Sequence, residues 1–389
     1  MQMIQPFRAT RPTRDKAYLV ATRSYVSYNP TELEDKLENN PFTFLHVINP
    51  SAQQNAPLQE RFEAVRDRFD MFCEEEIFVT ENNPSYFIYE QRTPNDRFLG
   101  VIGLLPVDQV KEGHVIKHEK TIEHREELFS QYLETTGFQA EPVLVFGDAN
   151  QTYHEILAQV MLERPEYEFS STDRYEHRLW FVPDTLTEDL KTALAKVQEV
   201  YIADGHHRLA SSVRVGDRLN DNSKAQGVLT MFMDESGVSI ASFERWFRLE
   251  EQQLELNELQ ERFYVEKVEH WTDEPKGDFE MYHEGSWYVL TSKLSIVPEL
   301  KAQLLLDEIL RPLLGVLDER NDSRLKYIRQ DGTDQSARMV EKGYQIGFRL
   351  PPVSVELLKN IGSAGGVMPP KSTYIEPKLR SGLLLHVFK

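Results

Sequence analysis

Several features that mark common protein classes are scarce in this sequence of 389 residues. It contains one cysteine, Cys73, which excludes an intramolecular disulfide and a cysteine-based zinc cage and fits a reducing compartment. The start, MQMIQPFRATRP, lacks the apolar core of a secretory signal, and no run approaches 18 apolar residues. We therefore expect a cytoplasmic protein with no membrane partner.

Basic residues are also few relative to acidic ones. The chain has 44 Lys and Arg against 63 Asp and Glu, a formal net charge of -19. Such a field repels a phosphate backbone, and no basic helix-turn-helix pattern is present. We expect small-molecule partners and no nucleic acid.

The usual nucleotide and hydrolase motifs are missing as well. The sequence contains neither G-x-x-x-x-G-K-[ST] nor G-x-G-x-x-G, and no G-x-S-x-G. Cys73 stands in an apolar helical stretch typical of a core position. Any bound nucleotide is therefore expected outside the P-loop and Rossmann schemes.

Hydrophobic patterning predicts an α/β (α+β) protein of ordinary globular composition. Strands are expected at 17–26, 42–48, 85–91, 97–108, 142–148, 176–184, 199–203, 280–292 and 342–350. Helices are expected at 55–76, 119–137, 151–163, 186–198, 208–221, 250–263, 297–315 and 354–362, with Gly137 as a helix stop. Two further strands joined by a turn at 235–237 are expected within 227–249. Approximate domains are 1–110, an N-terminal α/β region, 111–240, a core, and 241–389, a C-terminal α+β region.

The stretch YIADGHHRLA, residues 201–210, combines groups suited to phosphate chemistry at an expected strand-to-helix turn. The first turn of a helix offers free N–H groups to an anion, and Gly205 permits close approach. Arg208 is a bidentate donor, and Asp204 can hold a divalent cation or take a proton. An alternative is that Asp204 caps the helix while His206 packs and His207 and Arg208 are solvated or salt-bridged. Adjacent histidines point about 100° apart, which disfavours a shared zinc ion.

Two other stretches carry charged groups of the same kind. GHVIKHEKT, residues 113–121, places His118 and Glu119 directly before a helix, where Glu119 is either a general base or an acid favoured by the helix dipole. MPPKSTYIEPKLRSG, residues 368–382, is a Pro-flanked basic loop in an acidic protein, and it is either an anion-binding loop or a solvated one.

Taken together, IKHEKT, IADGHHR and MPPKST resemble the motifs of free serine kinases of the ParB/sulfiredoxin-fold superfamily, in the same order. The whole chain, with FLHVI, SYFIYEQ and HRLWFV, resembles the bacterial domain-of-unknown-function family 1015 with its ADGHHR signature. The kinases' Pro-His-Glu reads Lys-His-Glu here, and about a hundred residues precede it without counterpart. Sulfiredoxin chemistry needs a cysteine in the motif, and histidine stands there instead.

The resemblance implies a ParB/sulfiredoxin-like core at 111–240 and a set of site residues. Glu119 and Asp204 would be catalytic, with Asp204 also the magnesium ligand. The residues implied in nucleotide and phosphate binding are Gly205, His206, His207, Arg208, Lys371, Ser372 and Thr373. Those implied in substrate binding are His118, His207 and Lys371.

Two functional hypotheses follow. The first is a kinase that uses ATP or ADP with Mg²⁺ to phosphorylate free L-serine or a similar small hydroxylated metabolite. The second is a nucleotide-binding regulatory protein of the same fold without turnover. Two carboxylates near a transferring phosphate favour the enzyme, since pure binding needs only the cationic cradle. The sequence leaves open the nucleotide, the oligomeric state and the role of residues 1–110.

Overall fold

The computed structural model describes residues 2–49, 56–249, 254–272 and 275–389. The chain forms two compact units, one of residues 1–238 with 377–389 and one of residues 239–376. The boundary expected near 110 falls in α5 (Val107–Lys111), inside the first unit, and the one expected near 240 falls in β12 (Ser239–Ala241). The C-terminal segment 377–389 therefore belongs with the N-terminal part of the chain.

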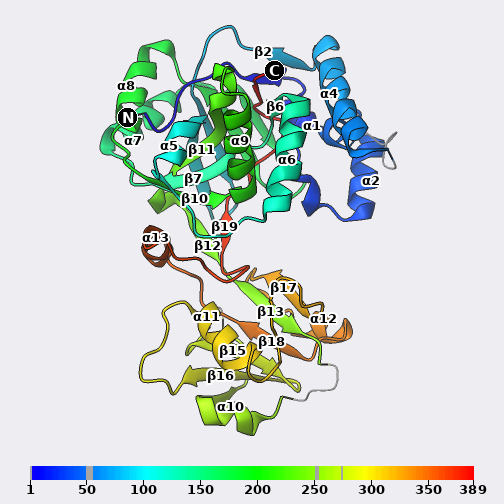
Figure 1. Ribbon diagram of the computed structural model, residues 1–389, viewed down its shortest axis with the longest axis vertical. Coiled ribbons are helices and arrows are strands. Elements are labelled where there is room, and N and C mark those ends of the chain that lie inside the picture. The colour runs from blue at the N-terminus through cyan, green and yellow to red at the C-terminus, as the bar shows by residue number, and fades with distance from the viewer. Residues whose placement is uncertain (1, 50–55, 250–253, 273–274) are drawn as a thin grey trace. The chain divides into compact units, whose positions relative to one another are not determined.

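The first unit is built on a mixed sheet, visible in Figure 1, whose strand order in the described residues is β5-β10-β7-β11-β4-β3-β9-β8. β10 is parallel to β5 and antiparallel to β7, and β7 is parallel to β11; the remaining pairs are antiparallel. The strands are β3 (Phe87–Arg92), β4 (Arg97–Pro106), β5 (Val115–Ile116), β7 (Val143–Gly147), β8 (Tyr167–Ser170), β9 (Glu176–Phe181), β10 (Val200–Asp204) and β11 (Gly227–Asp234). The expected pair of strands at 85–91 and 97–108 is confirmed by β3 and β4.

Helices pack around this sheet. α6 (Glu123–Thr136) and α9 (His206–Arg218) lie side by side (Figure 1). α7 (Gln151–Val160) and α8 (Asp184–Leu194) contribute Tyr153, Leu157, Leu190 and Leu194 to the main core, and α4 (Leu58–Glu74) lies in a second cluster. Gly137 ends α6 in the left-handed conformation at φ 73°, which confirms it as the helix stop.

Two expected strands near the N-terminus are wrong. Residues 17–26 form α1 (Ala17–Val20) and the 3₁₀ turn Tyr25–Ser27, and 42–48 contain α3 (Leu45–Ile48). Phe44 and Val47 pack in a cluster with Phe69 and Phe78, so these short apolar runs are buried through tertiary packing and not through sheet pairing. A short buried run has no periodicity that separates the two cases. Smaller pairs elsewhere in this unit are β1 (Thr10–Pro12) with β2 (Phe78–Thr80) and β6 (Phe138–Gln139) with β20 (His386–Val387).

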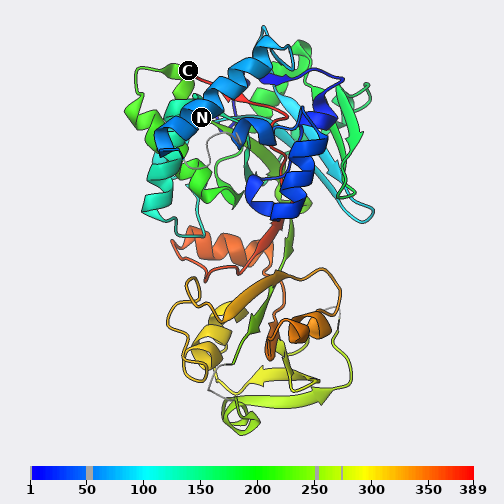
Figure 2. The ribbon, with the colours of Figure 1, turned by 90° about the vertical axis from the view of Figure 1, so that its right-hand side faces the viewer.

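The second unit contains an antiparallel sheet of order β14-β16-β15-β18-β13-β17 and the separate pair β12–β19. Its elements are β13 (Phe243–Phe247), α10 (Leu256–Arg262), β14 (Phe263–Val268), β15 (Phe279–His283), β16 (Ser286–Ser292), α11 (Lys301–Leu305) with a π-helical continuation to Leu310, β17 (Leu325–Arg329), α12 (Ser336–Glu341), β18 (Ile346–Arg349), α13 (Val355–Ser363) and β19 (Tyr374–Glu376). Figure 1 views α13 nearly end-on, and Figure 2 shows its length.

Two turns, at 284–285 and at 235–237, connect strands in a way that the sequence did not predict. The run 280–292 is a hairpin and not one strand, because Glu284 and Gly285 both have positive φ (45° and 76°) and reverse the chain. The turn at 235–237 is confirmed, but β11 before it pairs in the first unit's sheet and β13 after it in the second's. The start of the helix expected at 250–263 lies outside the described residues.

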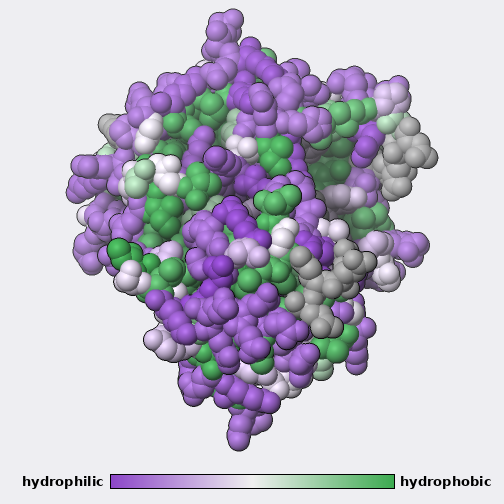
Figure 3. All heavy atoms as spheres, turned by 60° about the horizontal axis from the view of Figure 1, so that its bottom comes forward, coloured by the Kyte–Doolittle hydropathy of each residue, from purple (hydrophilic) through white to green (hydrophobic). Residues whose placement is uncertain are grey.

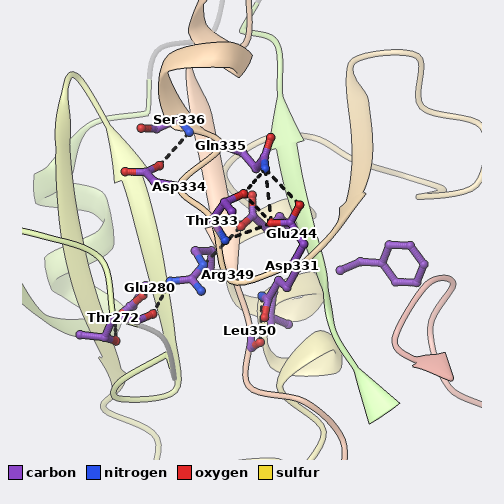
Figure 4. A network of polar contacts seen from close by, with 12 residues as sticks. Glu244, Thr272, Glu280, Asp331, Thr333, Asp334, Gln335, Ser336, Arg349 and Leu350 are labelled. Carbon is purple, nitrogen blue, oxygen red and sulfur yellow. Dashed lines mark hydrogen bonds and ion pairs between the residues drawn. The ribbon is translucent and has the colours of Figure 1, made fainter. Parts of the chain in front are cut away.

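The second unit buries a polar network around Arg349 (Figure 4). Arg349 donates from Nη1 to Glu280 (3.0 Å) and lies 3.3 Å from Glu244, while Trp246 donates to Glu244 (2.7 Å). Burial raises the pKa of Glu244 to about 7 in spite of these partners. Arg349 on β18 thus joins side chains of the two neighbouring strands, Glu244 on β13 and Glu280 on β15.

The face drawn in Figure 3 is mostly hydrophilic, with apolar residues in small separate patches. Large exposed apolar side chains such as Leu162, Ile296 and Leu317 are far apart in the sequence. Among the described helices, none has the length and apolar character needed to cross a membrane.

Candidate active site

The DGHHR turn, residues 204–208, follows an irregular end of strand β10. The pairing of β10 with β7 shifts register between Ile202 and Asp204, so β10 carries one extra residue just before the turn. Such bulges redirect the following side chain. Gly205 then takes φ 98°, and α9 begins at His206. The expectation that Asp204 ends a strand and that His207 and Arg208 lie in the first helical turn is confirmed.

Asp204 is held between two cations. Lys378 Nζ donates to its Oδ1 (2.5 Å), and Arg208 Nη2 donates to its Oδ2 (2.9 Å). Burial alone would raise the pKa of Asp204, but Lys378 and Arg208 outweigh burial and hold that pKa well below its usual range. Asp204 is therefore ionised at neutral pH.

Arg208 connects this carboxylate to a second one. Its Nη1 lies 2.5 Å from Glu141 Oε1, and its Nη2 also approaches the Pro142 carbonyl oxygen (3.3 Å). The other Glu141 oxygen accepts a hydrogen bond from Ser381 (2.9 Å). Arg208 Nε is buried without a hydrogen-bond partner. The guanidinium that the sequence assigned to phosphate is thus shared by two protein carboxylates.

His206 lies on another side of α9, where the Glu119 segment reaches it. Glu119 precedes α6 in a bend, and its Oε2 is 3.9 Å from His206 Nδ1. The rings of His118 and His206 meet edge to face with centroids 4.6 Å apart. The structure therefore brings together three residues of the two motifs, Glu119, His118 and His206.

Both imidazoles are neutral at physiological pH. Burial lowers the pKa of His118 to about 4 and, with His118 nearby, that of His206 to about 3. The charge of Asp204 acts on His206 in the opposite direction. His118 Nδ1 and His206 Nε2 are buried without hydrogen-bond partners. Buried nitrogens of this kind are available to a ligand, because a ligand group can satisfy them.

The C-terminal segment adds residues to this site. Besides Lys378 and Ser381, Arg380 donates to both oxygens of Asp173 (2.7 Å each), and Gln91 donates to the Lys378 carbonyl oxygen (3.3 Å). Lys378 and Arg380 stood in the basic loop that the sequence singled out, but Glu141 and Asp173 carried no local signal. Their roles depend on partners remote in the sequence.

The other part of that basic loop belongs to the second unit. Lys371 has φ 54°; its carbonyl oxygen accepts from the buried Arg245 (3.4 Å), and its Nζ lies 5.1 Å from the Phe243 ring centroid. Ser372 is buried and donates to the Pro369 carbonyl oxygen (2.7 Å), and Thr373 is half-buried. Whether Lys371, Ser372 and Thr373 contact a ligand bound at the DGHHR turn stays a prediction.

Within the described ranges no three His, Cys, Asp or Glu side chains are grouped so that they could hold a metal ion. This does not conflict with magnesium, which commonly uses one or two carboxylates with water and substrate phosphates. Asp204 fits that pattern, since it is ionised and already attracts cations at both oxygens.

The fold and site thus define a mixed α/β protein with a charged strand-to-helix turn between β10 and α9. The family described as "Protein of unknown function (DUF1015)" matches residues 4–319, and the chain belongs to this family. No curated protein matches the chain.

Solved structures of two kinds are similar to it. A variant of free serine kinase in complex with AMP has 16% identity and a TM-score of 0.38, covering 72% of this chain and 91% of that one. SbnI with a C-terminal truncation, from Staphylococcus aureus, has 14% identity and a TM-score of 0.41, covering 71% and 82%. A free serine kinase variant in complex with ADP has 15% identity and a TM-score of 0.39, covering 75% and 97%.

Proposed function

We propose that this protein is a kinase that transfers a phosphoryl group from ATP or ADP to a small hydroxylated metabolite, with free L-serine as the candidate acceptor. In this proposal the core around β10 and α9 is ParB/sulfiredoxin-like. Glu119 removes the proton of the acceptor hydroxyl, and the resulting oxygen attacks the terminal phosphorus. The bond from that phosphorus to its bridging oxygen breaks, and the shortened nucleotide leaves.

One observation carries the proposal: the carboxylate of Glu119 and the buried imidazole of His118 both meet His206, the first residue of α9, directly after the Asp204-Gly205 turn. Glu119 lies 3.9 Å from His206, and the negative charge of Asp204 also acts on His206. A purely structural turn does not need two ionisable acids around an imidazole whose Nε2 has no partner. Phosphoryl transfer needs a base, a positioned anion and fixed donors near one point.

The charges around Asp204 indicate why a divalent cation belongs in the proposal. Lys378 and Arg208 are balanced by Asp204 and Glu141, so these four side chains present no net positive charge to a phosphate. Mg²⁺ held by Asp204 would supply charge neutralisation on the transferring group and free Lys378 to face the phosphate. His206, His207 and the backbone N–H groups that follow Gly205 complete the phosphate contacts.

The acceptor's own charges assign the remaining residues. An amino acid with a free hydroxyl presents an ammonium and a carboxylate. The proposal assigns the ammonium to the acidic groups near Glu119 and the carboxylate to the cationic Lys371 loop, with His118 in substrate binding. Ethanolamine lacks the carboxylate and glycerate lacks the ammonium, so each would leave a charged group of the site unpaired and should be a poor substrate. Threonine carries both charges but adds a methyl group, so it should be a weak substrate.

Product analysis tests this function directly. The purified chain is incubated with L-serine, Mg²⁺ and either ATP or ADP, and O-phosphoserine is measured by mass spectrometry. The proposal expects product with at least one nucleotide and none without Mg²⁺. Equal turnover of glycerate and serine would show that the ammonium is not recognised, and would move the assignment to a general small-alcohol kinase.

A regulatory protein that binds nucleotide without turnover is the second candidate. It is favoured by the engagement of both Asp204 oxygens with Lys378 and Arg208, which leaves the carboxylate neutralised inside the protein. This candidate expects nucleotide binding by calorimetry with no phosphorylated product from any hydroxylated amino acid.

A further inference from the structure

A pocket of about 290 Å³ lies in the first unit, beside α6 and α9. Its wall is mainly apolar and includes five aromatic side chains, Tyr25, Phe44, Phe129, Tyr132 and Phe138. The volume corresponds to roughly ten water molecules. An apolar wall of this kind suits a flat ring and is a poor environment for a zwitterion the size of serine.

The pocket shares a wall with the DGHHR turn. Arg208 lines the pocket, and its guanidinium also lies next to Gly205. A Cβ added to Gly205 would be 3.0 Å from Nη2 of Arg208. Ser212, about two turns along α9 from Gly205, also lines the pocket. At the helical rise per residue, Ser212 lies about 10 Å along the axis from Gly205. This span suits a nucleoside whose phosphates sit at the helix start.

Polar groups stand at a few points of the otherwise apolar wall. Ser24, Ser212 and Ser381 contribute hydroxyl groups, and that of Ser381 already donates to Glu141. Gln139, Glu141 and Arg208 complete the polar lining. A heteroaromatic base has apolar faces and a polar edge, so it can stack on the aromatic rings while its edge atoms meet these groups.

We propose that this pocket binds the heteroaromatic base of a nucleotide whose phosphates lie at the DGHHR turn. The inference rests on the proposed function and adds a role for the N-terminal region, because Ser24, Tyr25, Phe44 and Ile48 close one side of the pocket. Residues that precede the Glu119 motif thus help to select the nucleotide.

The test compares a ligand with a base and one without, by isothermal titration calorimetry on the full chain. ADP and inorganic pyrophosphate are titrated into the wild type and into Phe129→Ala, which removes one half of a stacked pair with Tyr132. Loss of base stacking should weaken ADP binding roughly 5- to 100-fold. The affinity for pyrophosphate should not change.

Two further variants secure the interpretation. Tyr25→Ala removes the aromatic ring of a pocket residue that is 43% exposed, so this variant should fold even if Phe129→Ala does not. It should also weaken ADP binding. Tyr18→Ala, at a 57% exposed tyrosine outside the lining, is the matched control and should bind ADP normally.

The outcomes separate the two proposals. If the wild type binds ADP and both pocket variants bind it equally well, the base pocket is refuted while nucleotide binding stands. If the wild type binds neither ADP nor pyrophosphate, the proposed function fails and the base pocket with it. Weaker ADP binding in the pocket variants alone supports the inference.

Discussion

Glu119→Gln is the substitution that most directly tests the proposed chemistry, because it removes basicity and keeps shape. Glu119 has 41% of its side chain exposed, so the change should alter the free energy of unfolding by less than about 0.5 kcal/mol. Loss of a general base lowers the rate roughly 10²- to 10⁴-fold, about 3 to 5 kcal/mol in activation free energy. His206 should not compensate, since with a pKa of about 3 it is a weak base.

The assay measures kcat for O-phosphoserine formation and, separately, nucleotide affinity by calorimetry. We expect kcat to fall and nucleotide affinity to stay within about twofold, because Glu119 acts on the acceptor. Glu123→Gln is the matched control, four residues away and 88% exposed, and should keep full activity. Full turnover by Glu119→Gln would refute the assignment and leave Glu119 as a helix-terminus acid.

Three further predictions concern the structure of the site. Arg208→Ala should lower the free energy of unfolding of the first unit by about 2 to 3 kcal/mol, because Glu141 loses its ion pair and Asp204 loses one of its two ion pairs. Urea unfolding followed by circular dichroism measures this free energy, and a loss below about 0.5 kcal/mol contradicts the prediction. Gly205→Ala should cost about 1 to 3 kcal/mol, because φ 98° is strained for alanine and its Cβ meets Arg208; an unchanged unfolding temperature would show that the turn relaxes freely. Acidification should also destabilise the protein: the pKa of His206 is lower folded than unfolded, so the unfolded state takes up its proton first and stability falls between about pH 6.5 and 3. His206→Gln should make that part of the curve of unfolding temperature against pH less steep, while His118, whose pKa is also lowered, keeps part of the slope. An identical curve would show that His206 does not contribute.

The local structure of the motif could be predicted from the sequence. Val200, Tyr201 and Ile202 form an apolar run, Gly205 permits positive φ, and the residues after it have helical periodicity. These are short-range effects, so β10, the turn and α9 lie where they were expected. The same reasoning failed at 17–26 and 42–48, where the apolar runs were too short to separate a buried helix from a strand.

Apart from the ion pair of Asp204 with Arg208, four residues away, the charge pairing of the site could not be predicted, because it depends on residues brought together by the fold. Lys378 donates to Asp204, 174 positions away in the sequence. It stands in the C-terminal segment 377–389, which belongs to the first unit although it follows the second unit in the sequence. The sequence by itself therefore determined the acid, the glycine and the start of the helix. Only the tertiary structure decided that Lys378 also neutralises Asp204 and that Glu141 shares Arg208, since a Coulombic interaction depends on distance in space and not on separation along the chain.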